Sequence, residues 1–434
     1  MSPGAAANVR HAAEPQVLNP RPTLNLTFKW SRPMDWKDAV STRDVGRRTV
    51  LAAGIVGAAL LALPDAKAMA AKAAMPTYVY VSSNASFFSG GAPNPDAIGL
   101  YVYQFDPKTG GLTPVQQVRG PSPSWMELDP SRRFLYVCYS LRGKVKLREG
   151  LVEAYAIDPR TGMLTLLNRI SLDSGPAQLA VSPDSRHLVV ANYYYGDYVV
   201  LPIGKDGQLS PISGTLTNTG KGPQQRQDAP HPHAVVFHPN GRFIGAADLG
   251  IDKVQTLRLV GDGLELVGEA SVVPGMGPRH LAFSRDGKTL YAIGELDGKI
   301  TAFPYDPVTG KIGDTFQTVS TEPPGYAGAH SGAEIAVHPS GKFLYGSNRA
   351  SQTIAGFQID GSTGKLSPIG YATEGVDIPT SFTIDPTGKW LYVPSNRGNN
   401  IVQFSIDPQT GTLKATGQKT SLAAPNVMLF RTPD

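Results

Sequence analysis

The chain has 434 residues, of which 47 are Gly, 37 are Pro and 17% are charged, a balance that suits many short strands joined by tight turns and excludes a disordered chain. Its single cysteine, Cys138, excludes a disulfide framework, a cysteine-based zinc site and a c-type haem attachment motif. Ten of the 40 Lys and Arg and five of the 35 Asp and Glu lie within residues 1–75, so the rest of the chain is net neutral although the formal charge is +5. A net-neutral body excludes a protein that binds nucleic acid through its phosphates.

Residues 1–75 are predicted to be a targeting segment that is not part of the fold. Arg47 and Arg48 precede a short apolar stretch over 49–63, which is followed by the small-residue run 66–70, the order of a cleavable export signal. The stretch is shorter than the roughly 20 residues that span a membrane, and the paired arginines resemble a twin-arginine signal, which exports a folded protein. We therefore expect the twin-arginine export machinery as a partner, a periplasmic or secreted location, and no membrane attachment after cleavage. The alternative is an uncleaved membrane anchor.

Seven copies of one turn divide residues 76–434. The pattern Asp-Pro-x-Thr-Gly-x-Leu, complete or shortened, occurs at 106–112, 158–164, 206–209, 262–264, 306–312, 360–366 and 407–413. Proline fixes φ and glycine supplies the positive φ that a tight hairpin needs, so each copy is predicted to join two antiparallel strands.

Two further repeats define the remaining strands. A turn followed by a strand occurs at 129–136, 238–244, 338–345 and 385–392, with looser copies at 182–183 and 284–291, and the seventh strand stands alone at 77–81. Before each turn lies a short strand that opens with Pro or Gly, at 123–128, 176–181, 232–237, 278–283, 332–337 and 379–384, with the seventh copy at 425–430. The carboxyl-terminal strand therefore completes the blade that begins at the amino terminus. These repeats predict an all-β, single-domain, seven-bladed β-propeller of four-stranded blades over 76–434, closed so that no edge strand is left open.

The chemistry is expected at one mouth of the central channel. The first and second strands of a blade are antiparallel, so the start of the first and the end of the second lie on the same face of the ring. Polar side chains gather at these positions: His233, Arg279, His280, Glu295, Glu334 and Arg349, together with Asn192, Asp248 and Asn348. The alternative interpretation is the polar lining of a wet channel.

This set suits an anionic ester. Arginine binds a carboxylate or phosphate through two parallel hydrogen bonds, His or Glu can activate water, and Arg can stabilise an oxyanion. A serine mechanism is disfavoured because no G-x-S-x-G motif occurs. His231 and His233 lack a third ligand with zinc-like spacing, and the acidic loop 248–252 is interpreted as a turn and not as a calcium site. No metal and no cofactor is expected.

The sequence resembles the bacterial lactonase family of seven-bladed propellers, which includes 6-phosphogluconolactonase and the carboxy-cis,cis-muconate lactonizing enzyme. The stretches that carry this resemblance are 226–233 (RQDAPHPH), 248–252 (DLGID), 277–283 (GPRHLAF), 294–296 (GEL), 333–335 (AEI) and 347–349 (SNR). The resemblance covers residues 77–434 and implies that His233, Arg279, Glu295 and Arg349 are the catalytic or substrate-binding groups. Family members commonly have Pro-Arg where this chain has Pro379-Thr380, and the loss of that cation weakens the case for a phosphorylated substrate.

We therefore predict a monomeric carboxylic ester hydrolase of carbohydrate metabolism that cleaves a small sugar-type lactone, in the manner of 6-phosphogluconolactonase. Glu295 or His233 is the general base, and Arg279 and Arg349 hold the anionic group and the developing oxyanion. Substrate contacts are expected from His280, Glu334, Asn348, Asn192 and Asp248. The alternatives are a muconate-type lactonizing isomerase and a non-enzymatic periplasmic binding propeller.

Overall fold

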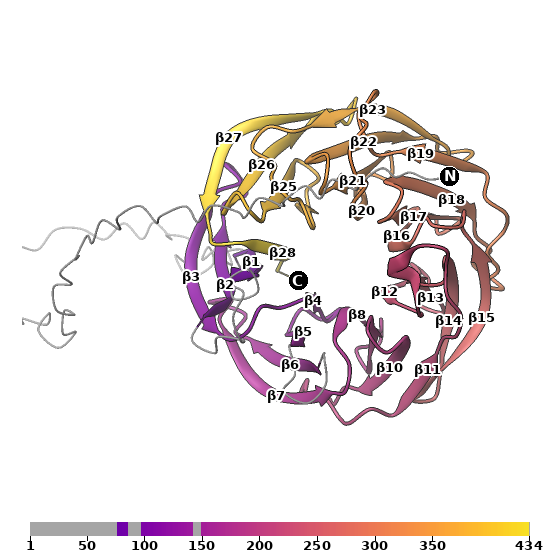
Figure 1. The fold of residues 1–434 in the computed structure, drawn as a ribbon. Coiled ribbons are helices and arrows are strands. Elements are labelled where there is room, and N and C mark those ends of the chain that lie inside the picture. The colour runs from indigo at the N-terminus through magenta and orange to yellow at the C-terminus, as the bar shows by residue number, and fades with distance from the viewer. Residues whose placement is uncertain (1–75, 86–96, 142–148, 434) are drawn as a thin grey trace, which may run out of the picture. The chain divides into compact units, whose positions relative to one another are not determined.

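Four-stranded antiparallel sheets, seven in number, make up the part of the chain that the computed structural model describes, residues 76–85, 97–141 and 149–433. They stand side by side around a central axis (Figure 1), which confirms the predicted seven-bladed propeller. The predicted export signal lies outside the described residues. Within the described ranges, no helix is long and apolar enough to cross a membrane.

Each blade is numbered in ring order, and its strands are given from the axis outward. Blade 1 contains β28 (Pro425–Arg431), β1 (Tyr78–Ser83), β2 (Ile98–Phe105) and β3 (Leu112–Arg119), and blade 2 contains β4 (Trp125–Leu128), β5 (Phe134–Leu141), β6 (Glu149–Ile157) and β7 (Leu164–Leu172). Blade 3 contains β8 (Pro176–Val181), β9 (His187–Asn192), β10 (Asp197–Pro202) and β11 (Gly214–Thr217), and blade 4 contains β12 (Pro232–Phe237), β13 (Ile244–Asp248), β14 (Lys253–Val260) and β15 (Gly263–Ser271).

Blade 5 contains β16 (Pro278–Phe283), β17 (Thr289–Gly294), β18 (Lys299–Pro304) and β19 (Gln317–Ser320), and blade 6 contains β20 (Gly332–Val337), β21 (Phe343–Asn348), β22 (Thr353–Ile359) and β23 (Leu366–Ala372). Blade 7 contains β24 (Thr383–Ile384), β25 (Trp390–Ser395), β26 (Asn400–Ile406) and β27 (Leu413–Ser421). A short 3-10 helix, η1 (Gln225–Gln227), lies in the connection between blades 3 and 4.

The ring closes through the pairing that the repeats predicted. β28, from the end of the chain, pairs antiparallel with β1, so that Val79 lies opposite Phe430 and Val81 opposite Met428. Val79 and Val81 are fully buried in an apolar cluster that also includes Tyr392 of blade 7. Closure therefore buries apolar surface between the last and first blades as well as adding hydrogen bonds.

A tyrosine in the second strand fastens most blades to the next one. The hydroxyls of Tyr80, Tyr136, Tyr291, Tyr345 and Tyr392 each donate to the carbonyl of a turn glycine in the following blade, at 2.7–3.0 Å. Five blades of the described ring carry this contact. The turn glycine has a positive φ, and at Gly110 (φ 73°) a Cβ would come within 2.6 Å of the Tyr392 hydroxyl, so both the turn and the contact require glycine. The predicted turns are thus hairpin connections, and five of the seven also receive this contact from the neighbouring blade.

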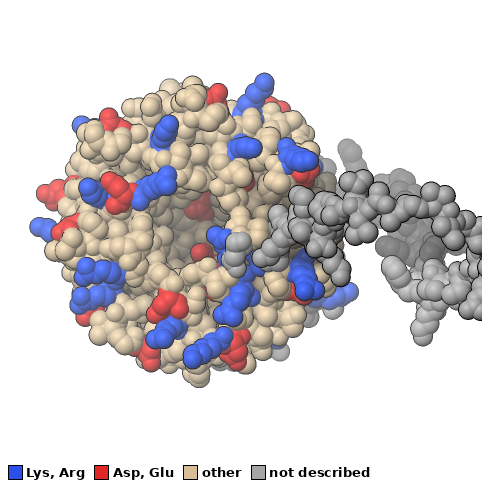
Figure 2. All heavy atoms as spheres, turned by 180° about the vertical axis from the view of Figure 1, so that it is seen from behind, with Lys and Arg blue, Asp and Glu red and all other residues tan. Residues whose placement is uncertain are grey.

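The face shown in Figure 2, opposite to that in Figure 1, is hollowed at its centre. Where it is described, Lys and Arg side chains on this face are scattered among Asp and Glu and form no continuous basic track. This arrangement agrees with the net-neutral composition of residues 76–434.

We predict that Tyr345→Phe lowers the urea midpoint of unfolding. The substitution removes the buried 2.7 Å hydrogen bond to the Gly411 carbonyl, at a cost of about 1–3 kcal/mol because the carbonyl stays buried without its donor. Tyr326→Phe is the matched control, since its hydroxyl makes an exposed bond to Ala329. Equal midpoints for wild type and Tyr345→Phe would show that the contact does not stabilise the ring.

Candidate active site

Six of the nine predicted site residues lie together at the channel mouth: His233, Arg279, His280, Glu295, Glu334 and Arg349. They come from blades 4, 5 and 6, which are neighbours in the ring (Figure 1). Glu295 follows β17, and its N–H donates to the Gly277 carbonyl at 2.8 Å. Arg349 follows β21, and its N–H donates to Ser331 at 2.9 Å. The second strands thus end against the starts of the first strands, as predicted.

An irregularity at the start of the innermost strands of blades 4, 5 and 6 aims these side chains. The pairing register shifts between Pro232 and Ala234 in β12, and in the same way between Pro278 and His280 in β16. β20 shifts between Gly332 and Ile335. A β-bulge of this kind re-aims the extra residue. It explains why the adjacent side chains of β16, Arg279 and His280, both reach the cluster although a regular strand would point them to opposite faces.

Glu295 is the centre of the site. Its carboxylate pairs with three guanidinium groups: Oε1 lies 2.6 Å from Nη1 of Arg226 and 3.0 Å from Nη2 of Arg349, and Oε2 lies 3.1 Å from Nε of Arg279. Nε2 of His233 is 3.9 Å from the same Oε2. Three cations therefore surround one anion, leaving an excess of positive charge toward any bound ligand.

Burial and the clustered charges set the protonation of the site. Burial alone would raise the pKa of Glu295, but the charges of Arg349 and Arg279, with Arg226, hold that pKa well below its ordinary value. Burial, together with Arg349, lowers the pKa of Arg279 to about 10, so it remains a cation at neutral pH. Burial and the nearby Arg279 lower the pKa of His233 well below its usual range. Glu295 is thus fixed as a carboxylate, and His233 is a neutral imidazole.

A second carboxyl group, that of Glu334, lies beside this cluster, and its pKa is shifted in the opposite direction to that of Glu295. Oε1 of Glu334 is 3.0 Å from Nδ1 of His280, and burial raises the pKa of Glu334 to about 8. The His280 ring lies 5.3 Å from that of His233 and 5.1 Å from that of Trp125, centroid to centroid. Trp125 belongs to blade 2, so its contact with His280 of blade 5 is made across the axis of the ring.

Arg226 is a member of the cluster that the sequence did not assign to the site, although it opens one of the stretches that carry the family resemblance. It lies on η1, which is held by the fully buried neighbour Gln227. The Gln227 amide donates to the Leu249 carbonyl at 2.9 Å and to Asp252 at 2.8 Å. Arg226 also donates to the Tyr193 hydroxyl at 3.2 Å. A connecting loop thus delivers a third cation that strand positions alone do not reveal.

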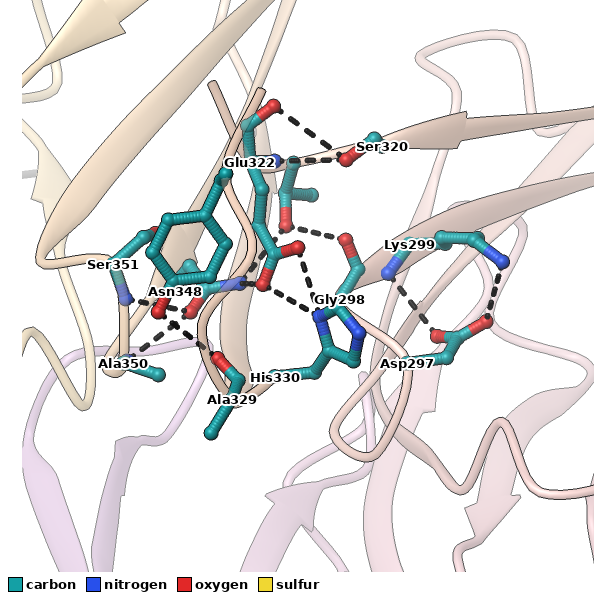
Figure 3. A network of polar contacts seen from close by, with 12 residues as sticks. Asp297, Gly298, Lys299, Ser320, Glu322, Ala329, His330, Asn348, Ala350 and Ser351 are labelled. Carbon is teal, nitrogen blue, oxygen red and sulfur yellow. Dashed lines mark hydrogen bonds and ion pairs between the residues drawn. The ribbon is translucent and has the colours of Figure 1, made fainter. Parts of the chain in front are cut away.

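Asn348 supports the turn that carries Arg349. Its amide donates to Oε1 of Glu322 at 3.0 Å, and its Oδ1 accepts from the N–H groups of Ala350 and Ser351 (Figure 3). Nδ1 of His330 lies 2.8 Å from the same carboxylate, so Glu322 joins the approach to β20 with the end of β21. These contacts hold the residue next to Arg349, while a direct contact of Asn348 with substrate stays a prediction.

Asp248 and Asn192 also have partners within the protein. Asp248 accepts the N–H of His231 at 2.7 Å and of Gly250 at 2.9 Å. Asn192 donates to Asp197 at 2.8 Å. None of these contacts joins them to the Glu295 cluster, so their assignment to substrate also stays a prediction. Among the described residues, no three His, Cys, Asp or Glu side chains are arranged to hold a metal ion.

Glu127 is a further acid of the channel, partly buried, that the sequence analysis did not single out. It lies in β4, and burial raises its pKa to about 7. The signal was present in the aligned repeats. At the fifth position of the innermost strands, the other six copies have Ala180, Val236, Ala282, Ala336, Thr383 and Leu429, so Glu127 is the one charged residue.

A closed seven-bladed ring with an arginine, histidine and carboxylate cluster at one mouth defines a propeller of the lactonase type. The family model described as "Lactonase, 7-bladed beta-propeller" matches residues 71–430, and the chain belongs to this family. The 6-phosphogluconolactonase of Bacillus subtilis is 33% identical over 291 residues, covering 66% of this chain and 80% of the relative. That of Formosa agariphila is 30% identical over 296 residues, covering 66% and 82%. Among solved structures, the periplasmic gluconolactonase PpgL of Pseudomonas aeruginosa is 27% identical with a TM-score of 0.74, covering 82% of this chain and 100% of that one.

We predict that Glu295→Gln destabilises the fold by about 3–5 kcal/mol at pH 7, because it leaves buried guanidinium charge without its anion. The lowered pKa of Glu295 also predicts a pH dependence with a definite sign. Its stabilising contribution is complete above the unfolded-state pKa, near 4.5, and is lost as pH falls toward the folded-state pKa. The urea midpoint of the wild type should therefore fall more steeply in acid than that of Glu295→Gln. Glu269→Gln, which removes an exposed partner of Lys253, is the control and should behave as wild type. Parallel curves for wild type and Glu295→Gln would contradict the assigned ion pairs.

Proposed function

We propose that this protein hydrolyses a small lactone at the Glu295 cluster. The observation that carries the proposal is the combination, around the buried carboxylate of Glu295, of the His233 imidazole with the guanidinium groups of Arg226, Arg279 and Arg349. A lactone presents a carbonyl that becomes an oxyanion on attack, and positioned guanidinium groups stabilise such charge. Membership of the lactonase family agrees with this chemistry.

Of the two candidate bases, the geometry favours His233. Both oxygens of Glu295 are occupied by guanidinium groups, so neither is left to accept a proton from an attacking water. The lowered pKa of His233 leaves it unprotonated at neutral pH, and its buried Nδ1 has no hydrogen-bond partner among the described residues. In this proposal Glu295 orients the arginines, His233 takes a proton from the attacking water, and Arg279 and Arg349 bind the carbonyl oxygen as it gains charge.

The substrate proposed is a sugar lactone without a phosphate group. Thr380 occupies the position where family members commonly have an arginine, so one cation for a phosphate is lacking. The similarity to a periplasmic gluconolactonase supports the same choice, whereas the curated relatives named above are called 6-phosphogluconolactonases. A panel that includes both free and phosphorylated lactones separates the two classes.

We predict that purified residues 76–434 open glucono-δ-lactone faster than the spontaneous reaction, measured by proton release. Arg279→Ala removes an oxyanion-binding cation and should lower kcat/KM by about 100–1,000-fold. His233→Gln removes the base and should lower kcat by about 100-fold or more. Arg258→Ala and His187→Gln alter exposed or outer ion pairs and serve as matched controls that keep wild-type rates.

Retained turnover in both Arg279→Ala and His233→Gln would place the reaction elsewhere. A folded wild type that turns over none of the sugar lactones would refute the hydrolase proposal. Loss of diene absorbance from a cis,cis-muconate would then favour the lactonizing isomerase. Tight ligand binding without turnover would favour a binding propeller.

We further propose that the protein is exported by the twin-arginine route and acts outside the cytoplasm. The support is the pair Arg47-Arg48 ahead of a short apolar stretch. Replacing both arginines by lysine keeps the positive charge but removes the paired guanidinium groups, so the full-length protein should accumulate in the cytoplasm. Cell fractionation with antibody detection measures this outcome, and a single Arg43→Lys change is the control. Unchanged export of the double variant would contradict the proposed route.

A further inference from the structure

We propose that Glu334 is the general acid of this site, which protonates the ring oxygen of the lactone as it leaves. This inference rests on the proposed function and assigns a catalytic role to a residue that was expected only to contact substrate. It concerns the second half of the reaction, for which the arginines and Glu295 provide no proton donor.

The hydrogen bonds of Glu334 leave one oxygen free for this role. Oε1 lies 3.0 Å from Nδ1 of His280 and accepts the N–H of Ile335 at 3.0 Å. Oε2 is buried and has no hydrogen-bond partner in the described structure. Assigning the ring proton of His280 to Nδ1 gives Oε1 two donors, and the proton of a neutral Glu334 then belongs on Oε2. The residue therefore carries an O–H that makes no internal hydrogen bond.

Arg279 joins Glu334 to the reacting centre. Nε of Arg279 donates to Oε2 of Glu295 at 3.1 Å, and Nη1 of the same guanidinium donates at 2.9 Å to the carbonyl of Ala333, the residue before Glu334. On the other side, the His280 ring that contacts Glu334 lies 5.3 Å from the ring of the proposed base, His233. Arg279 and His280, which are neighbours in β16, thus link the proposed acid, Glu334, to the Glu295 cluster and to the proposed base, His233.

The surroundings of Glu334 account for its protonation. Burial raises its pKa to about 8, opposed by the positive charge of Arg279. The other ionisable groups that face this region are His280 from β16, Glu295 after β17, Arg349 after β21 and Glu127 from β4 across the axis. Glu295 and Glu334 are therefore two carboxyl groups of one site whose environments drive their pKa values in opposite directions, the arrangement that separates a fixed carboxylate from a proton donor.

His233 and Glu334 together account for both proton transfers of the reaction. Water attacks the carbonyl carbon while His233 takes one of its protons, and the carbonyl π electrons move onto the oxygen that the arginines bind. When the carbonyl re-forms, the bond between the carbon and the ring oxygen breaks. Its electron pair stays on the ring oxygen, which takes the proton from Oε2 of Glu334. The product is a hydroxy acid, and the proton on His233 returns through solvent to the Glu334 carboxylate.

The test compares wild type, Glu334→Gln and Glu334→Asp on glucono-δ-lactone between pH 6 and 9, with spontaneous hydrolysis subtracted. Glutamine keeps the shape and the oxygen that His280 contacts but cannot deliver a proton, so kcat should fall by about 100-fold or more with little change in KM. The wild-type kcat should decline as pH rises through about 8, because Glu334 then loses its proton. Glu334→Asp should retain this decline, and Glu334→Gln should lose it.

Glu127→Gln is the matched control, since it makes the same change at another, partly buried acid of the channel, and it should keep the wild-type kcat at pH 7. A Glu334→Gln variant with kcat within twofold of wild type, or with an unchanged alkaline decline, overturns the role of Glu334 while leaving the lactonase function standing. Absence of turnover in the wild type overturns the function itself. The infrared carbonyl band of a protonated carboxyl group, present in wild type at pH 7 and reduced in Glu334→Gln, measures the proton directly. If that difference is absent, the proposal is wrong.

Discussion

The pairing of β28 with β1 is the constraint on which the rest of the molecule depends. It joins residues more than 340 positions apart and turns a row of seven sheets into a ring. Only in a ring do β12, β16 and β20 converge with β4 on a common axis, so that Trp125 of blade 2 meets His280 of blade 5. The site therefore depends on how the blades are arranged and not on any single blade, because blade 4 contributes one of its six groups, blade 5 three and blade 6 two.

The proposed chemistry depends on two similar side chains, Glu295 and Glu334, that lie in different surroundings. Glu295 and Glu334 are both buried carboxyl groups at the same mouth, yet three guanidinium groups surround the first, whereas the second contacts a histidine and a backbone N–H. The blades that supply them are copies of one architectural unit. Function arises where the copies differ, and the shared backbone holds the differing side chains at fixed distances from one another.

The sequence predicted the blade count, the closing strand and six of the clustered residues because each depends on a local repeat: turn, strand and strand start recur in register. It did not assign Arg226 to the site, because that residue reaches Glu295 from a connecting loop whose path depends on the Gln227–Asp252 contact. It did not predict the bulges that let Arg279 and His280 act on one side, because a register shift leaves no mark in the residue pattern. Our proposal of His233 and not Glu295 as base likewise rests on the ion pairs, which join residues far apart in the sequence.

The tyrosine contacts between blades have a consequence for how such a ring can change in evolution. Each hydroxyl reaches the turn glycine of the following repeat, and Tyr392 of the last blade reaches Gly110 of the first. A gene that gained or lost a repeat of the kind found in blades 1, 2, 6 and 7 would still encode blades that match their neighbours, since each of these four blades carries both the donor and the acceptor. The number of blades in the closed ring is then set by the angle at which neighbouring blades pack. The number of repeats in the gene can change while the tyrosine–glycine contacts between neighbours stay the same. The same modularity allows one blade to acquire new chemistry without altering the joints that hold it.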